Sequence, residues 1–227
     1  MEYIDKIGER IETRSLFIYL VIIYIIFSIG DILNHSHYLY PDIFKIISGV
    51  LILIISFVYL PIRNLYMNVL NFSILKKLST YFWIVFIYMM FFYLNHLFFK
   101  SGFLMNTGLL DNYYSPIRFP LRFNHEFILY IFTSGILFPI WEELVQRVCT
   151  VVFLSRLFPL WICVILQAII FGLLHMDKPL LIILFALLSF FLWFVTKSII
   201  PSIIFHMLYN IHGGLLIYYN IDVIPRW

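Results

Sequence analysis

The residues best suited to chemistry lie in an apolar run of the sequence, where Glu142, Glu143 and Arg147 fall within six positions. An ionisable side chain at membrane depth costs about 2.5–3.5 kcal/mol on insertion scales, so such residues persist mainly where they face a cavity and meet a partner. Glu143 and Arg147 are four residues apart and share one face of a helix, whereas Glu142 points about 100° away. We therefore expect Glu143 to pair with Arg147 and Glu142 to be free to react.

Two further motifs follow with the same four-residue spacing, Phe171 with His175 and His206 with Asn210. A carboxylate and an imidazole can take a proton from water and pass it to a leaving amine, as peptide hydrolysis requires. A second imidazole and a carboxamide can donate hydrogen bonds to the oxyanion of a tetrahedral intermediate. These residue types predict that Glu142 and His175 activate water and that His206 and Asn210 form an oxyanion hole.

Other interpretations of the same residues stay open. Two histidines with one or two glutamates can hold zinc, but the sequence lacks an HExxH helix and asparagine is a poor zinc ligand, so we expect no metal and keep zinc as an alternative. Taken singly, Glu143 with Arg147 is more often a pair that stabilises helix packing, and His206 with Asn210 is equally well explained as an interhelical hydrogen-bonding pair. An ion-coupled transporter would also use intramembrane acids and histidines, but the repeat symmetry typical of transporters is not found in the sequence.

The composition excludes an ordinary soluble domain. Of the 227 residues, 63% are hydrophobic and 12% are charged, and the mean hydropathy is +0.98. The net charge of +3 comes from short basic loops and gives no reason to expect a nucleic-acid partner. The two cysteines, Cys149 and Cys163, lie in apolar segments and imply no disulfide framework.

Long apolar stretches predict one all-α polytopic membrane domain over residues 1–227, with N-terminal helices and a linker in 1–124 and a catalytic core in 125–219. About seven transmembrane helices are expected, at 16–33, 43–60, 81–99, 125–157, 160–176, 179–196 and 201–219. Basic residues near the N-terminus and in the loop at 61–80 place both segments on the cytoplasmic side of the membrane.

Three segments of this plan carry more specific expectations. Residues 1–15 are predicted to cap the bundle at the membrane surface, and 100–124 to form a linker that holds a surface helix or a loop gating the substrate. The fourth span is longer than a bilayer core requires, and Pro139 inside it is expected to bend the helix beside the acidic pair.

The sixth span sets a geometric condition on the site. If 179–196 crosses the whole bilayer, His175 and His206 end up about 25 Å apart at opposite faces. We therefore expect this span to be short or strongly tilted, or the segment Lys197–Pro201 to re-enter the protein. Imidazoles more than about 12 Å apart would exclude a shared site, because catalysis through water needs hydrogen-bond reach.

The three motifs, in this order and spacing, resemble those of the CAAX protease and bacteriocin-processing family. The resemblance covers about residues 125–219. It implies a membrane endopeptidase in which Glu142 and His175 activate water and His206 and Asn210 stabilise the oxyanion. The residues that it assigns to supporting the site are Glu143, Arg147 and Phe171.

The family also suggests partners and a setting. Its members cleave lipidated or hydrophobic peptides, or act in peptide maturation and bacteriocin self-immunity. The expected partners are thus a hydrophobic peptide or protein substrate and the lipid bilayer, and the short chain is more typical of a member from a bacterial cell membrane. A non-proteolytic immunity or scaffold protein with the same motifs is the alternative.

Overall fold

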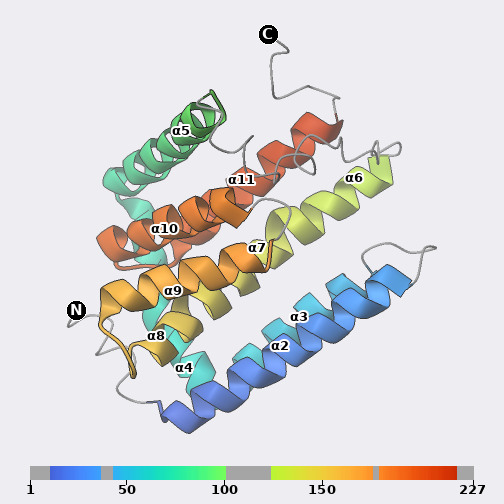
Figure 1. Ribbon diagram of the computed structural model, residues 1–227, viewed down its shortest axis with the longest axis vertical. Coiled ribbons are helices and arrows are strands. Elements are labelled where there is room, and N and C mark those ends of the chain that lie inside the picture. Colours follow the sequence, from blue (N-terminus) through green and yellow to red (C-terminus); the bar gives the residue numbers. More distant parts are fainter. Residues whose placement is uncertain (1–10, 37–42, 101–123, 176–178, 219–227) are drawn as a thin grey trace.

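The protein is a helical bundle in its computed structural model, which describes residues 11–36, 43–100, 124–175 and 179–218 (Figure 1). Every regular element in these ranges is a helix, as the sequence predicts. Most of the predicted cap at 1–15 and nearly all of the predicted linker at 100–124 lie outside the described residues.

The first two helices, α2 (Thr13–Ser36) and α3 (Ile43–Val58), pack side by side along one edge of the bundle (Figure 1). α3 ends where Pro61 begins α4 (Leu60–Val69), because proline is favoured in the first turn of a helix and disfavoured inside one. The chain turns by 93° at this break.

The segment predicted as a loop at 61–80 is instead largely helical. It contains α4, the short 3-10 helix η1 (Phe72–Lys76) and the start of α5 (Leu78–Lys100). α4 is amphipathic and too short to span a bilayer, which is why a search for apolar runs passes over it. Its buried side chains recur at helical spacing, at Ile62, Leu65, Tyr66 and Val69.

A continuous helical stretch, here called the site helix, runs from Asn124 to Leu154 through the centre of the bundle. It consists of α6 (Asn124–Tyr130), the π-helical segment η3 (Ile131–Leu137), α7 (Phe138–Glu142), a second π-helical segment η4 (Glu143–Thr150) and α8 (Val151–Leu154). Just before Pro139, the N–H of Phe138 donates to the carbonyl of Thr133, five residues earlier. The wider turns carry the helix past the missing proline N–H, and such π segments frequently occur at functional sites.

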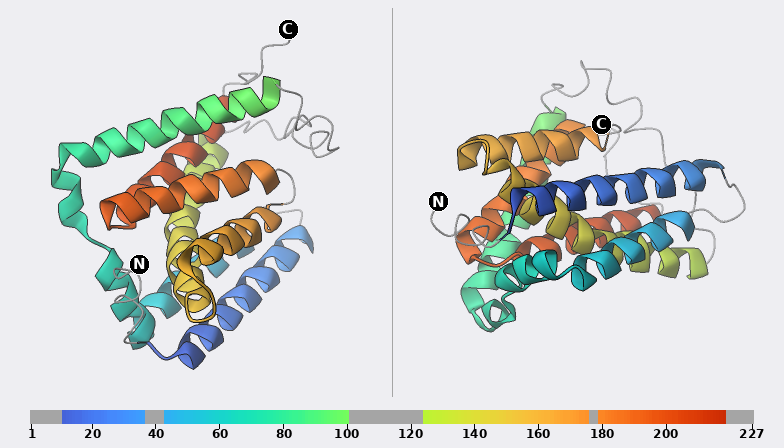
Figure 2. Two further views of the ribbon diagram at one scale, coloured as in Figure 1. Left: turned by 60° about the vertical axis from the view of Figure 1, so that its left-hand side comes forward. Right: turned by 90° about the horizontal axis from the view of Figure 1, so that it is seen from below.

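Three helices complete the back half: α9 (Leu160–Leu173), α10 (Pro179–Thr196) and α11 (Ile200–Tyr218). Figure 2 shows α9, α10 and α5 stacked in a layer that lies across the site helix and α11. An aromatic core joins this layer to α11, formed by Phe91, Phe171, Phe185 and Phe205.

The seven predicted spans each coincide with a helix, but their lengths differ. Within the residues that the structure describes, four stretches are long and apolar enough to cross a membrane: Thr13–Gly30, Leu78–Asn95, Phe127–Leu154 and Pro179–Thr196. A fifth is added if the bent pair of α3 with α4 and η1 is one span, and α9 is only 14 residues long. The number of seven crossings therefore stays a prediction.

The link between α10 and α11 is folded into the protein. Lys197 adopts a left-handed conformation with φ of 56°, and Ser198 and Ile199 after it are fully buried. Ser198 Oγ donates to the carbonyls of Val69 and Asn71 at 3.3 and 3.2 Å, and the Ile199 N–H donates to Val69 at 3.1 Å. α10 has 18 residues and is not short, and the residues after the exposed Lys197, from Ser198 to Pro201, are buried in the protein as expected for a segment that re-enters it.

Candidate active site

A buried ionic cluster lies at the start of η4. Glu143 Oε1 lies 3.4 Å from Arg147 Nη2, and both side chains are fully buried. Ser189 of α10 donates to Glu143 Oε2 at 2.7 Å, and Nδ1 of His206 lies 2.9 Å from Glu143 Oε1. The predicted pairing of Glu143 with Arg147 is confirmed, and both oxygens of Glu143 are engaged.

Arg147 is held by charge and by aromatic contact. Its guanidinium carbon lies 4.3 Å from the centre of the Phe171 ring, close enough for a cation–π interaction. Its nitrogens make no hydrogen bond within the described residues. Phe171, expected to support the site, therefore covers the cation that neutralises Glu143.

His206 lies between the two consecutive glutamates. Because Nδ1 faces the Glu143 carboxylate at hydrogen-bond distance, Nδ1 carries a proton and donates it. The other ring nitrogen, Nε2, lies 3.6 Å from Glu142 Oε2. Two carboxylates, one guanidinium and one imidazole therefore meet in this cluster.

His175 follows the last turn of α9, with its ring against Phe171 at a centroid distance of 4.7 Å. His206 lies 6.2 Å from the same ring, so the centres of the two imidazoles are at most 10.9 Å apart. The condition of 12 Å for a shared site is thus met. Nδ1 of His175 donates to the Phe171 carbonyl at 2.9 Å, which leaves Nε2 to exchange protons.

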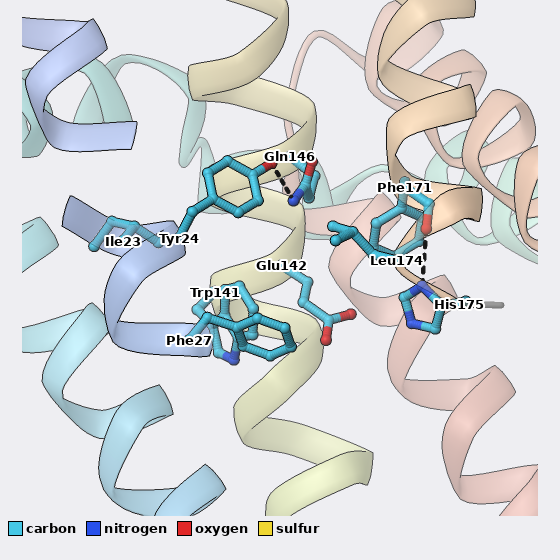
Figure 3. Close-up of a pocket in the computed structure, with 9 residues that line it drawn as sticks. All are labelled: Ile23, Tyr24, Phe27, Trp141, Glu142, Gln146, Phe171, Leu174 and His175. Atoms are coloured by element: carbon cyan, nitrogen blue, oxygen red, sulfur yellow. Dashed lines mark hydrogen bonds between the residues drawn. The ribbon is translucent and has the colours of Figure 1, made fainter. Parts of the chain in front are cut away.

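Glu142 and His175 line the same pocket (Figure 3). The carboxylate of Glu142 points toward His175 across it, and the Glu142 side chain is 12% exposed, unlike its fully buried neighbour Glu143. The cavity has a volume of about 40 Å³, which holds roughly three waters at 10–15 Å³ each. A water between a carboxylate and an imidazole is the arrangement that general base catalysis requires.

Asn210 makes a contact that the sequence pattern does not indicate. Its Nδ2 donates to the carbonyl of Ser134 at 2.7 Å, tying α11 to the site helix, and the residue does not line the pocket. Its second amide hydrogen is the one left for an oxyanion. The geometry therefore brings together Glu142, His175 and His206, and holds Asn210 at the edge of the set.

Few side chains on the pocket wall could bind a metal ion. The described residues contain no group of three or more His, Cys, Asp and Glu side chains placed to hold a metal ion. Glu143 is occupied by Arg147, Ser189 and His206, so only Glu142 and His175 remain as ligands on the pocket wall.

Two contributors to the site were not predicted. Ser189 was detectable in principle, because it is the only hydroxyl in the apolar run from Pro179 to Val195. Tyr24 of α2 accepts a hydrogen bond from Gln146 Nε2 at 2.7 Å at the pocket wall, and nothing distinguishes it among 16 tyrosines in the sequence.

The segment that contains these residues is similar to a known protein family. Residues 124–212 match the family model described as type II CAAX prenyl endopeptidase Rce1-like. Residues 124–212 form an Rce1-like domain. No curated protein and no solved structure matches the chain. The Rce1-like domain contains all seven residues that the motifs single out, from Glu142 to Asn210.

The Rce1-like domain and the apolar helices together define the protein's class. The matching family model describes CAAX prenyl endopeptidases, and four stretches of the described chain are long and apolar enough to cross a bilayer. The chain is an integral membrane protein with a protease-like domain.

Proposed function

We propose that the protein is an intramembrane, glutamate-dependent endopeptidase that cleaves a hydrophobic peptide at the membrane. The observation that carries this proposal is that Glu142 and Glu143 lie in different surroundings. One carboxylate is locked by Arg147, Ser189 and His206, while the other faces a pocket opposite His175. A protein that needed these acids only for packing would have no reason to leave Glu142 unpaired with the arginine.

The proposed reaction begins with a water in the pocket. Glu142 accepts a proton from this water while the oxygen of the water attacks the peptide carbonyl carbon. The electrons of the carbonyl bond move onto its oxygen, which forms a tetrahedral oxyanion. When the intermediate collapses, the carbon–nitrogen bond breaks and the proton passes from Glu142 to the leaving amine. His175 lines the same pocket across from Glu142, and its Nε2 assists either proton transfer.

His206 is proposed to stabilise the oxyanion. Glu143 fixes the orientation of the ring through Nδ1, so Nε2 points out of the buried cluster toward Glu142. A proton on Nε2 is then available to a developing negative charge, in surroundings where water is largely excluded. Asn210 is proposed as a second donor through the amide hydrogen that Ser134 does not use.

The substrate and setting are proposed from the family and the composition. A membrane endopeptidase of this kind acts on the end of a hydrophobic or lipidated peptide, and a bacterial protein of this size is suited to peptide maturation or bacteriocin self-immunity. A non-proteolytic immunity protein would retain its protective effect in Glu142→Gln, whereas a protease would lose it.

The direct test is cleavage by purified protein in lipid vesicles. A library of fluorogenic apolar peptides, with and without a C-terminal prenylated cysteine, supplies the substrates. Glu142→Gln should abolish cleavage and leave the protein folded, because the buried pair of Glu143 and Arg147 stays intact. Glu12→Gln, at an exposed acid of the described chain, is the matched control. Cleavage by Glu142→Gln at the rate of the control would overturn the proposal.

A further inference from the structure

One wall of the pocket comes from outside the Rce1-like domain. Ile23, Tyr24 and Phe27 of α2 line it, and they recur on one side of that helix at positions i, i+1 and i+4. The opposite wall comes from Phe171, Leu174 and His175 at the end of α9 (Figure 3). The reactive side of the pocket therefore belongs to the Rce1-like domain and the facing side to the N-terminal helices.

The wall on α2 is apolar beside Glu142 and polar at its far end. The ring of Phe27 packs against Trp141 at a centroid distance of 5.4 Å. Tyr24 meets Gln146 through a hydrogen bond of 2.7 Å. Figure 3 shows the pair of Phe27 and Trp141 beside Glu142, and Tyr24 with Gln146 one turn along the site helix.

The volume of the pocket limits what can bind beside Glu142. Its 40 Å³ provides roughly three water-sized positions. One is needed for the attacking water, which leaves two, room for a small aliphatic group and not for an aromatic ring. Phe27 is the apolar aromatic side chain that α2 places on this wall.

We propose that α2 determines the specificity of the enzyme, and that Phe27 selects substrates with a small apolar side chain next to the cleaved bond. This inference rests on the proposed endopeptidase function. Phe27 makes no contribution to proton transfer and acts only on the fit of the substrate. Substrate choice is then set by a helix outside the region that matches the family.

The test compares peptides that differ only in the residue beside the cleaved bond, carrying Ala, Val or Phe. The wild-type protein should prefer Ala and Val. Phe27→Ala should shift the ratio of kcat/KM for the Phe peptide over the Ala peptide by at least about tenfold, the order of discrimination that an apolar pocket achieves. Phe27→Trp should shift preference in the opposite direction and exclude Val, which keeps the inference testable if Phe27→Ala does not fold.

Phe17→Ala is the matched control, because Phe17 lies on the same helix, is 54% exposed and packs on Phe153, away from the pocket. Its peptide preference should equal that of the wild type. Binding of the same fluorescent peptides to Glu142→Gln, with and without Phe27→Ala, gives a readout independent of cleavage.

The outcomes separate the two proposals. Cleavage with unchanged preference in both Phe27 variants would overturn the role of α2 and leave the protease assignment intact. Binding that follows residue size and Phe27, without cleavage by the wild type, would overturn the protease assignment and support the specificity wall. Absence of both binding and cleavage would overturn both.

Discussion

Arg147 offers the sharpest test of the buried cluster. Arg147→Met removes the cation that faces Glu143 and keeps an apolar side chain of similar length against Phe171. Removing one partner of a buried pair costs about 3–5 kcal/mol, because an uncompensated charge remains in the interior. Glu143 keeps its contacts with Ser189 and His206, which places the expected loss near the lower end, at about 3 kcal/mol.

Thermal unfolding in detergent, followed by tryptophan fluorescence, measures this loss. A change of 1 kcal/mol moves the midpoint by about 2–4 °C for a chain of this size, so Arg147→Met should unfold roughly 6–12 °C below the wild type. Arg63→Met, at an exposed arginine of α4, is the matched control and should leave the midpoint unchanged.

A double variant isolates the pair itself. Glu143→Gln alone leaves the Arg147 guanidinium buried without its carboxylate, whereas Glu143→Gln with Arg147→Met removes both charges. The double variant should lose about 1–3 kcal/mol less than the sum of the single losses, as coupled neighbours do. If Arg147→Met unfolds at the temperature of Arg63→Met, or if the two losses simply add, the interpretation of the cluster is wrong.

Two further predictions concern packing and metal. Gly214→Ala should cost about 1–3 kcal/mol of stability, because a Cβ there would overlap the Tyr130 ring. Gly213→Ala is the control and should cost nothing, since a Cβ at this position meets no atom within 4 Å. Equal unfolding midpoints of the two variants would contradict the contact with Tyr130. Incubation with a strong zinc chelator should leave peptide cleavage unchanged, since Glu142 and His175 alone make an incomplete zinc site. A loss of cleavage that added zinc restores would favour the zinc alternative.

Local spacing accounts for the parts of the site that could be predicted. The pairing of Glu143 with Arg147 depends on a four-residue repeat within one helix, and such contacts follow directly from helical geometry. The separation of Glu142 from this pair follows from the same geometry. The helical bundle itself follows from apolar runs in a chain that must satisfy its backbone internally.

Tertiary contacts account for the parts that could not. His206 shares a face with Asn210 in the sequence pattern, yet in the structure it bridges Glu142 and Glu143 while Asn210 binds Ser134. The depth of His206 depends on the buried turn at Lys197, which no periodicity reveals. The hydrogen bond of Tyr24 with Gln146 depends on where α2 packs, and the sequence of α2 does not indicate this position.

The same turn has a consequence for biogenesis. Ser198 binds the carbonyl of Val69, a residue 129 positions earlier in the chain. At a synthesis rate of roughly 5–20 residues per second, that carbonyl leaves the ribosome about 6–26 s before its partner. The amphipathic helix α4 must therefore wait at the membrane for this interval, until the link between α10 and α11 emerges and Ser198 binds it.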